Sequence, residues 1–179
     1  KNNVFSNNFK DIINILNNKY FINTNLLFNK SKSKKSINKY KDTKDKEYLL
    51  EVSEVINKSK KPILYLGQGA IGLSDKLMRF IERYNIPVTT TIHGLGLIDQ
   101  NHYLSLKWLG MHGYAPANYA IQKSDCIICL GARFDDRTTG EVSKYAPNAK
   151  NIIHINIEES EICKNVKSNY NIVDTAENF

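Results

Sequence analysis

The sequence of 179 residues contains no run of eighteen or more apolar residues, which excludes an ordinary membrane-spanning helix. Its first residues lack the apolar core and small-residue ending that define a secretory signal peptide. Cysteine is scarce, with three residues in all. Because disulfides persist mainly in oxidising compartments, an odd count without a secretory signal predicts an intracellular location. Plastid, mitochondrion and cytoplasm are all compatible with this prediction.

Two of the cysteines, Cys126 and Cys129, form a C-x-x-C pattern. A redox or zinc site would need this pattern on a turn or at the start of a helix. Here it lies within the apolar stretch 125–130, which is typical of a strand. Residues three positions apart on a strand point to opposite faces. We therefore expect two buried structural cysteines and no metal site.

Glycine and proline are both absent from residues 1–45, whereas the remainder holds all nine glycines and all four prolines. Residues 1–45 contain 11 asparagines and 10 lysines and carry the entire net charge of +7. This composition predicts a low-complexity linker or insertion, with a basic segment that contacts another domain as the alternative. Because residues 46–179 are neutral overall, a nucleic-acid-binding domain is disfavoured.

Residues 46–179 alternate between amphipathic segments and short, continuous apolar runs. The predicted helices span 47–59, 73–84, 115–122 and 159–165, and the predicted strands span 63–66, 87–91, 126–130, 151–157 and 170–173. A long glycine-bearing stretch, 92–113, is predicted to be irregular. Continuous apolar strands indicate a parallel sheet that is buried on both faces. The predicted fold class is therefore α/β, an open, doubly wound, Rossmann-like parallel sheet.

Residues 67–72 form a G-x-G-x-x-G pattern between a predicted strand and a predicted helix. This is the context of a dinucleotide fingerprint, in which missing Cβ atoms let the backbone approach a phosphate. The acidic residue expected about twenty residues later is replaced by threonines at 89–91. An NAD-dependent dehydrogenase is therefore disfavoured, and a tight glycine turn without a ligand is the alternative.

Residues 131–140 follow a predicted buried strand and carry Arg133 and Arg137, with Asp135 and Asp136 between them. The planar guanidinium fork suits bidentate contact with phosphate. The aspartates would hold the arginines or accept hydrogen bonds from ribose. The alternative is a surface network of ion pairs, which contributes little to stability.

A third stretch, 109–113, places Met111 and His112 between glycines, which suggests close backbone approach to a flat or charged group. Histidines are more often structural than catalytic, and we interpret His93 and His154 as packing or loop residues.

These stretches together resemble the acetolactate synthase (acetohydroxyacid synthase) family. The most specific are Leu-Gly-Met-His-Gly at 109–113 and Arg-Phe-Asp-Asp-Arg-Thr-Thr-Gly at 133–140. Further matching stretches are 61–69, 86–88, 94–96, 117–120, 154–157 and 162–165. The resemblance runs from residue 47 to the end of the sequence, and relatives such as glyoxylate carboligase vary within the second specific stretch.

The resemblance implies a thiamine-diphosphate- and Mg²⁺-dependent carboligase that condenses two 2-keto acids with loss of CO₂, in branched-chain amino-acid biosynthesis. The substrates would be pyruvate and 2-ketobutyrate, and residues 46–179 would form a central domain that binds FAD without a net redox role. The implied FAD contacts are Gly67, Gln68, Gly69, Thr91, Ile92, His93, Leu109, Gly110, Met111, His112, Gly131, Ala132, Arg133, Asp135, Arg137, Asn156, Ile157, Asp174 and Thr175. Met111, Asp136 and Arg137 would also face the channel to the thiamine site.

The sequence departs from the family at Asn156, where an acidic residue is usual, and at His93 and Val173. It contains no Gly-Asp-Gly, the stretch with which the family binds Mg²⁺-diphosphate. We therefore expect a fragment of a longer polypeptide that is inactive alone, the full enzyme being a homo-oligomer, with a regulatory subunit left open. The alternatives are a nucleotide-binding scaffold or regulatory module without catalysis, or another thiamine enzyme such as an oxidase, a decarboxylase or a glyoxylate carboligase.

Overall fold

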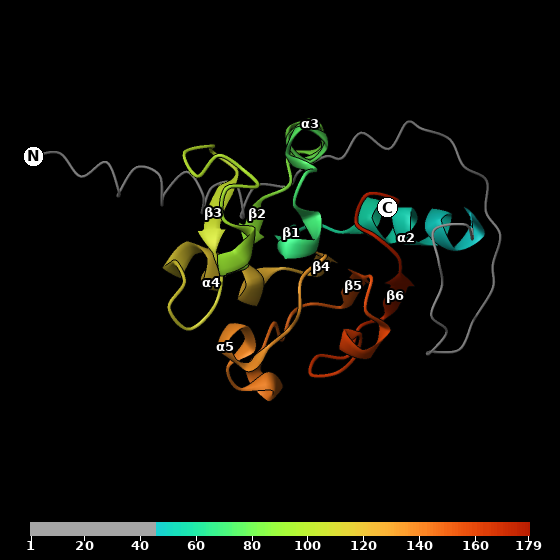
Figure 1. Cartoon of the computed structure of the whole chain (residues 1–179). Helices are drawn as coiled ribbons and strands as arrows, with labels where there is room; N and C mark the ends of the chain where they lie inside the picture. Colours follow the sequence, from blue (N-terminus) through green and yellow to red (C-terminus); the bar gives the residue numbers. More distant parts are fainter. Residues whose placement is uncertain (1–45) are drawn as a thin grey trace, which may run out of the picture.

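The computed structural model describes residues 46–179, so the predicted linker or insertion at 1–45 lies outside the described residues. In the described part, six parallel strands form one sheet in the order β3-β2-β1-β4-β5-β6 (Figure 1). The strands are β1 (Pro62–Leu66), β2 (Val88–Thr90), β3 (Ser105–Trp108), β4 (Cys126–Leu130), β5 (Asn151–Asn156) and β6 (Tyr170–Val173). The predicted α/β, Rossmann-like parallel sheet is confirmed.

Helices cover both faces of the sheet, as a doubly wound fold requires. The α-helices are α2 (Lys46–Lys58), α3 (Ser74–Tyr84), α4 (Ala115–Lys123) and the single-turn α5 (Asp136–Thr139). In Figure 1, α2 and α3 lie on one face, and α4 and α5 lie on the other. α3 ends because Asn85 adopts a left-handed conformation, with φ of 53°, which stops helical winding.

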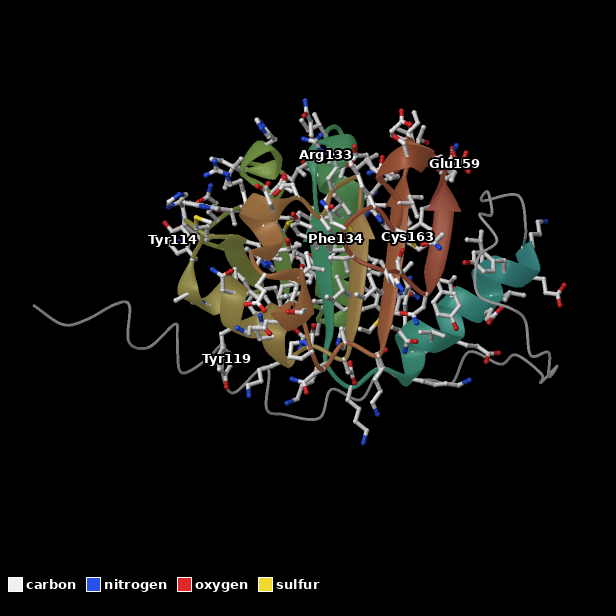
Figure 2. All side chains as sticks on the ribbon, turned by 90° about the horizontal axis from the view of Figure 1, so that it is seen from below. Tyr114, Tyr119, Arg133, Phe134, Glu159 and Cys163 are labelled. Carbon is white, nitrogen blue, oxygen red and sulfur yellow. The ribbon has the colours of Figure 1, made fainter. Side chains whose placement is uncertain are left out.

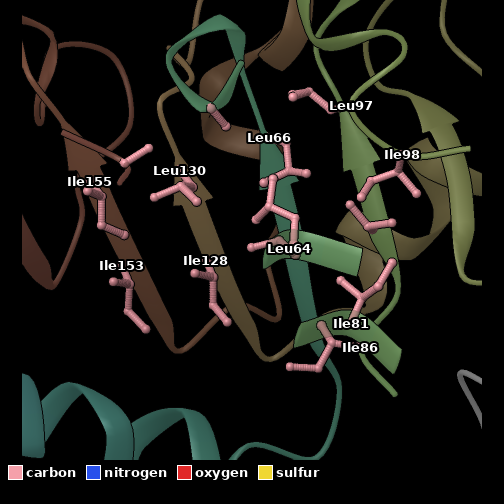
Figure 3. Close-up of a cluster of buried hydrophobic side chains, with 14 of the residues drawn as sticks. Leu64, Leu66, Ile81, Ile86, Leu97, Ile98, Ile128, Leu130, Ile153 and Ile155 are labelled. Carbon is pink, nitrogen blue, oxygen red and sulfur yellow. The ribbon is translucent and has the colours of Figure 1, made fainter. Parts of the chain in front are cut away.

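Two apolar cores result, one on each face of the sheet. Figure 3 shows the core beneath α2 and α3, where Leu64, Ile128 and Ile153 come from the neighbouring strands β1, β4 and β5. Fully burying each such side chain contributes about 1.5–3 kcal/mol. β1 and β4 are buried at every position, which explains why their sequences are continuous apolar runs rather than alternating ones.

The two cysteines of the C-x-x-C pattern lie in β4, are buried, and face different cores, as predicted. Burial raises the pKa of the Cys126 thiol to about 11 and also raises that of Cys129. Both side chains are therefore neutral packing groups near neutral pH.

Two sequence-based assignments were wrong. The stretch 92–113 contains the edge strand β3, whose Lys107 has φ of 66° and interrupts regular pairing with β2. The predicted helix 159–165 is only the 3₁₀ turn Glu159–Glu161, because Cys163 adopts a left-handed conformation with φ of 57°. None of the helices in residues 46–179 combines the length and apolar character that crossing a bilayer requires.

Candidate functional site

The strand order places a topological switch point between β1 and β4. The chain continues from β1 to β2 and β3 on one side and from β4 to β5 and β6 on the other. Ligands of open α/β sheets bind outside the carboxyl ends of the strands at such a point. The loops that leave β1 and β4 there are 67–72 and 131–140, two of the three glycine-containing stretches singled out in the sequence.

These two loops pack backbone against backbone. The Gly67 amide donates to the Leu130 carbonyl oxygen at 3.0 Å, and the Gly69 amide donates to that of Gly131 at 3.0 Å. A Cβ at Gly67 would lie 2.2 Å from the Gly131 carbonyl oxygen, and one at Gly69 would lie 2.8 Å from the Gly131 Cα. Both glycines are therefore required for contact between the loops, a reason that the fingerprint pattern did not indicate.

The loop after β3 joins the same assembly. The Met111 amide donates to the Arg137 carbonyl oxygen at 2.8 Å, and a Cβ at Gly110 would lie 2.8 Å from that oxygen. From β2, the Thr91 amide donates to the Leu66 carbonyl oxygen at 2.8 Å. The structure thus brings together the predicted residues that follow β1, β2, β3 and β4.

Arg133 and Arg137 are exposed, and Figure 2 shows Arg133 at the edge where the strands end. Neither arginine forms an ion pair within the part of the chain that the structure describes. The Asp135 carboxylate instead caps α5, because its Oδ1 accepts from the Thr138 amide at 2.9 Å. Residues 131–140 therefore do not form a surface network of ion pairs among the described residues, and the guanidinium groups of Arg133 and Arg137 are exposed.

Asn156 ends β5 next to the β4 loop. Its Nδ2 donates to the Ala132 carbonyl oxygen at 3.0 Å, and its Oδ1 accepts from the Glu158 amide at 3.0 Å. Both ends of the amide are therefore engaged within the protein. An aspartate here would turn an oxygen toward the Ala132 carbonyl, which explains physically why an amide suits this position.

The predicted residues after β6 lie one strand farther from the switch point. The Asp174 amide donates to the Asn156 carbonyl oxygen at 3.2 Å. The Asp174 Oδ1 accepts from the Thr175 amide at 2.7 Å and from Asn178 Nδ2 at 2.8 Å. This carboxylate thus shapes the turn after β6 at the edge of the sheet.

Large apolar side chains are exposed along the carboxyl edge. Each follows the end of β1, β2, β3 or β5 within five residues: Ile71, Ile92, Leu95, Met111 and Ile157. Met111 is 63% exposed and Ile157 is 70% exposed. Apolar side chains beside free guanidinium groups suit a ligand that has flat rings and an anionic centre. FAD, with two ring systems and a pyrophosphate, has this chemistry, so the residues present fit it.

Sequence reasoning missed the polar side chains that hold the β4 loop from below, chiefly Tyr65 and Asn165. Tyr65 Oη lies 3.3 Å from the Arg133 carbonyl oxygen, and Asn165 Nδ2 donates to that of Phe134 at 2.7 Å. The only sequence signal was a tyrosine within an otherwise aliphatic strand. Among residues 46–179, no group of three or more acidic, histidine or cysteine side chains could hold a metal ion.

Comparison with known proteins gives a family match over residues 49–179, to "Thiamine pyrophosphate enzyme, central domain". The chain is 44% identical over 126 residues to acetolactate synthase 1, chloroplastic, of Zea mays, covering 70% of this chain and 20% of that protein. It is 48% identical over 118 residues to acetolactate synthase, chloroplastic, of Arabidopsis thaliana, covering 66% and 18%. It is 46% identical over 125 residues to the probable acetolactate synthase large subunit of Methanococcus aeolicus, covering 69% and 21%. The chain thus spans about a fifth of the length of these relatives.

Proposed function

This chain belongs to the family of thiamine pyrophosphate enzyme central domains, and we therefore propose that it is the FAD-binding central domain of an acetolactate synthase. The domain would comprise residues 46–179. The complete enzyme would condense two pyruvates, or pyruvate and 2-ketobutyrate, with loss of CO₂ in branched-chain amino-acid biosynthesis. Thiamine diphosphate and Mg²⁺, held outside this domain, would supply the carbanion chemistry.

The observation that carries the FAD assignment is the meeting of loops 67–72 and 131–140 at the switch point, with two free arginines beside exposed apolar side chains. The Arg133 and Arg137 guanidinium groups suit the pyrophosphate, because their planar forks match phosphate oxygens. Met111, Ile92 and Ile157 are the apolar surfaces available to the rings.

The remaining proposed contacts fall into groups according to whether the backbone or the side chain of each residue is available to a ligand. Gly67, Gly69, Leu109, Gly110, Gly131 and Ala132 would contribute mainly backbone, since the loops already pack closely there. Gln68, His93 and His112 are exposed polar side chains next to these turns. Asp135, Asn156 and Asp174 have polar side-chain atoms engaged within the protein, so they would act chiefly by shaping the turns. Thr91 and Thr175 take part in the same turns, since Thr91 Oγ1 accepts from the Gly94 amide and the Thr175 amide donates to Asp174.

Met111, Asp136 and Arg137 are the proposed residues of the channel toward the thiamine site. Their side chains are all exposed, and the hydrogen bond from the Met111 amide to the Arg137 carbonyl oxygen keeps the first and the last together. An exposed guanidinium group at this point would attract the carboxylate of a 2-keto acid.

We propose a homo-oligomer for the complete enzyme, since thiamine sites in this family form between subunits, and an intracellular location. The relatives include chloroplastic plant proteins and an archaeal protein, so they do not choose among plastid, mitochondrion and cytoplasm. A regulatory subunit would be a further partner.

Titration of the chain with FAD, followed by flavin fluorescence, tests the proposal. Arg133→Gln should weaken FAD binding by about 10- to 150-fold, because a charge-assisted hydrogen bond contributes about 1.5–3 kcal/mol. Arg79→Gln, at an exposed arginine on α3, should leave the affinity unchanged. A wild-type chain that binds ADP but not FAD would indicate another thiamine enzyme, and equal affinities of the two variants would contradict the site.

A further inference from the structure

We propose that Tyr65, the last residue but one of β1, is a positioning residue that fixes the flavin-binding loop 131–140 from beneath, an inference that rests on the proposed function. Its side chain is fully buried on the face of the sheet that α4 and α5 cover. Tyr65 Oη lies 3.3 Å from the Arg133 carbonyl oxygen and 3.4 Å from Thr138 Oγ1. One hydroxyl therefore links the start of the loop to α5, on either side of the Asp135-Asp136-Arg137 turn.

The loop depends on such side-chain contacts, because three consecutive carbonyl groups in it accept hydrogen bonds from side chains of other segments. The Ala132 carbonyl oxygen accepts from His154 Nε2 at 2.9 Å and from Asn156 Nδ2 at 3.0 Å, and the Phe134 carbonyl oxygen accepts from Asn165 Nδ2 at 2.7 Å. The Arg133 carbonyl is the middle member, and Tyr65 is its donor. The residue whose carbonyl Tyr65 holds, Arg133, is one of the two arginines proposed to bind the pyrophosphate.

An aromatic cluster gives the Tyr65 hydroxyl a fixed place. The Phe134 ring packs 5.8 Å from the Tyr65 ring, 5.8 Å from the Tyr145 ring and 5.1 Å from the His154 ring, measured between centroids. Figure 2 shows Arg133 at the edge of the sheet and Phe134 deeper along its face. Burial raises the pKa of Tyr65, so the hydroxyl keeps the proton it donates.

The expected consequence is an effect on ligand affinity. An exposed arginine on a loose loop must lose backbone and rotamer freedom when it binds an anion, and this ordering weakens binding. Holding its carbonyl group from below removes part of that cost before the ligand arrives. Loss of the Tyr65 hydroxyl should therefore weaken FAD binding even though Tyr65 lies beneath the ligand-facing residues.

Tyr145 provides a matched control within the same cluster. It is buried and packs against the same Phe134 ring, but its hydroxyl has no hydrogen-bond partner among the described residues. Tyr145→Phe and Tyr65→Phe each remove one buried hydroxyl group, and only Tyr65→Phe removes contacts to the loop.

The experiment compares FAD affinity of the wild-type chain, Tyr65→Phe, Tyr145→Phe and Thr138→Val. Trp108 is the single tryptophan of the chain, and its Nε1 donates to the His112 carbonyl oxygen at 3.2 Å, so its fluorescence reports on the site. Tyr65→Phe should bind FAD about three- to tenfold more weakly, the loss expected for one net hydrogen bond, and should change the visible spectrum of the bound flavin. Thr138→Val should weaken binding in the same direction, and Tyr145→Phe should match the wild type.

The outcomes separate the two proposals. If the wild type binds FAD and Tyr65→Phe binds it as tightly as Tyr145→Phe does, the positioning role is wrong while the FAD site stands. A merely structural role would lower the melting temperature of the ligand-free chain and leave the affinity and the spectrum unchanged. If Tyr65→Phe fails to fold, Thr138→Val decides, and unchanged binding in that variant overturns the inference. A wild-type chain that binds no FAD removes the proposed function and this inference with it.

Discussion

His154 is a buried histidine whose ring cannot take up a second proton without cost. Its Nε2 faces the Ala132 carbonyl oxygen at 2.9 Å, an acceptor, so Nε2 carries the proton of the neutral ring. Burial, the largest cause, lowers the pKa of His154, although the Ala132 hydrogen bond and nearby Glu161 act in the opposite direction. The folded chain therefore binds this proton less readily than the unfolded chain does.

Stability should accordingly fall as pH decreases through the ordinary histidine pKa of about 6.5, because only the unfolded chain gains the proton there. The slope from one group is at most about 1.4 kcal/mol per pH unit. Urea unfolding at pH 7.5 and pH 5.5 measures it. His154→Gln should flatten the dependence, whereas His93→Gln, at an exposed histidine, should retain it. Equal slopes in both variants would show that His154 is not the group responsible.

Among the strands, those with more buried residues could be predicted from the sequence, and the strand with few buried residues could not. β1 and β4 were predictable because each is a continuous apolar run that is buried at every position. β5 and β6 contain polar residues but keep enough apolar, buried positions to be recognised as strands. The edge strand β3 was not, because its sequence, Ser105–Trp108, mixes polar and apolar residues and its pairing depends on β2. The single turn of α5 has too few residues for a periodic pattern to be visible.

Helix α5 depends on its N-cap, since a four-residue helix has little packing surface of its own. The Asp135 carboxylate accepts from the Thr138 amide at 2.9 Å and leaves Asp136 exposed. Asp135→Ala should reduce the free energy of unfolding by about 1 kcal/mol, a typical loss for an N-cap. Asp135→Asn, which retains an accepting oxygen, and Asp136→Ala should each cost less than half as much. Chemical denaturation of the three variants measures this, and equal losses at 135 and 136 would contradict the capping role.

For the molecule as a whole, the loops that meet at the switch point were predictable and their manner of meeting was not. Glycine spacing and the paired arginines identified 67–72 and 131–140, because both patterns directly follow apolar runs that were expected to be buried strands. The backbone contact between Gly67 and Gly131, and the support from Tyr65, join residues more than sixty positions apart. No local pattern encodes such a contact, since it exists only once β1 and β4 lie side by side.

The whole chain should therefore bind a flavin without catalysing the reaction of its relatives. The site residues described above are proposed to bind a dinucleotide, whereas a thiamine enzyme of this family also needs the Gly-Asp-Gly stretch for Mg²⁺-diphosphate, which this sequence does not contain. With pyruvate, thiamine diphosphate, Mg²⁺ and FAD, the 179-residue chain should form no acetolactate detectable by mass spectrometry. FAD should raise its melting temperature, which shows in the same preparation that the domain is folded, whereas thiamine diphosphate with Mg²⁺ should not. Acetolactate production by the chain alone would mean that the thiamine site is built from residues other than those the family uses.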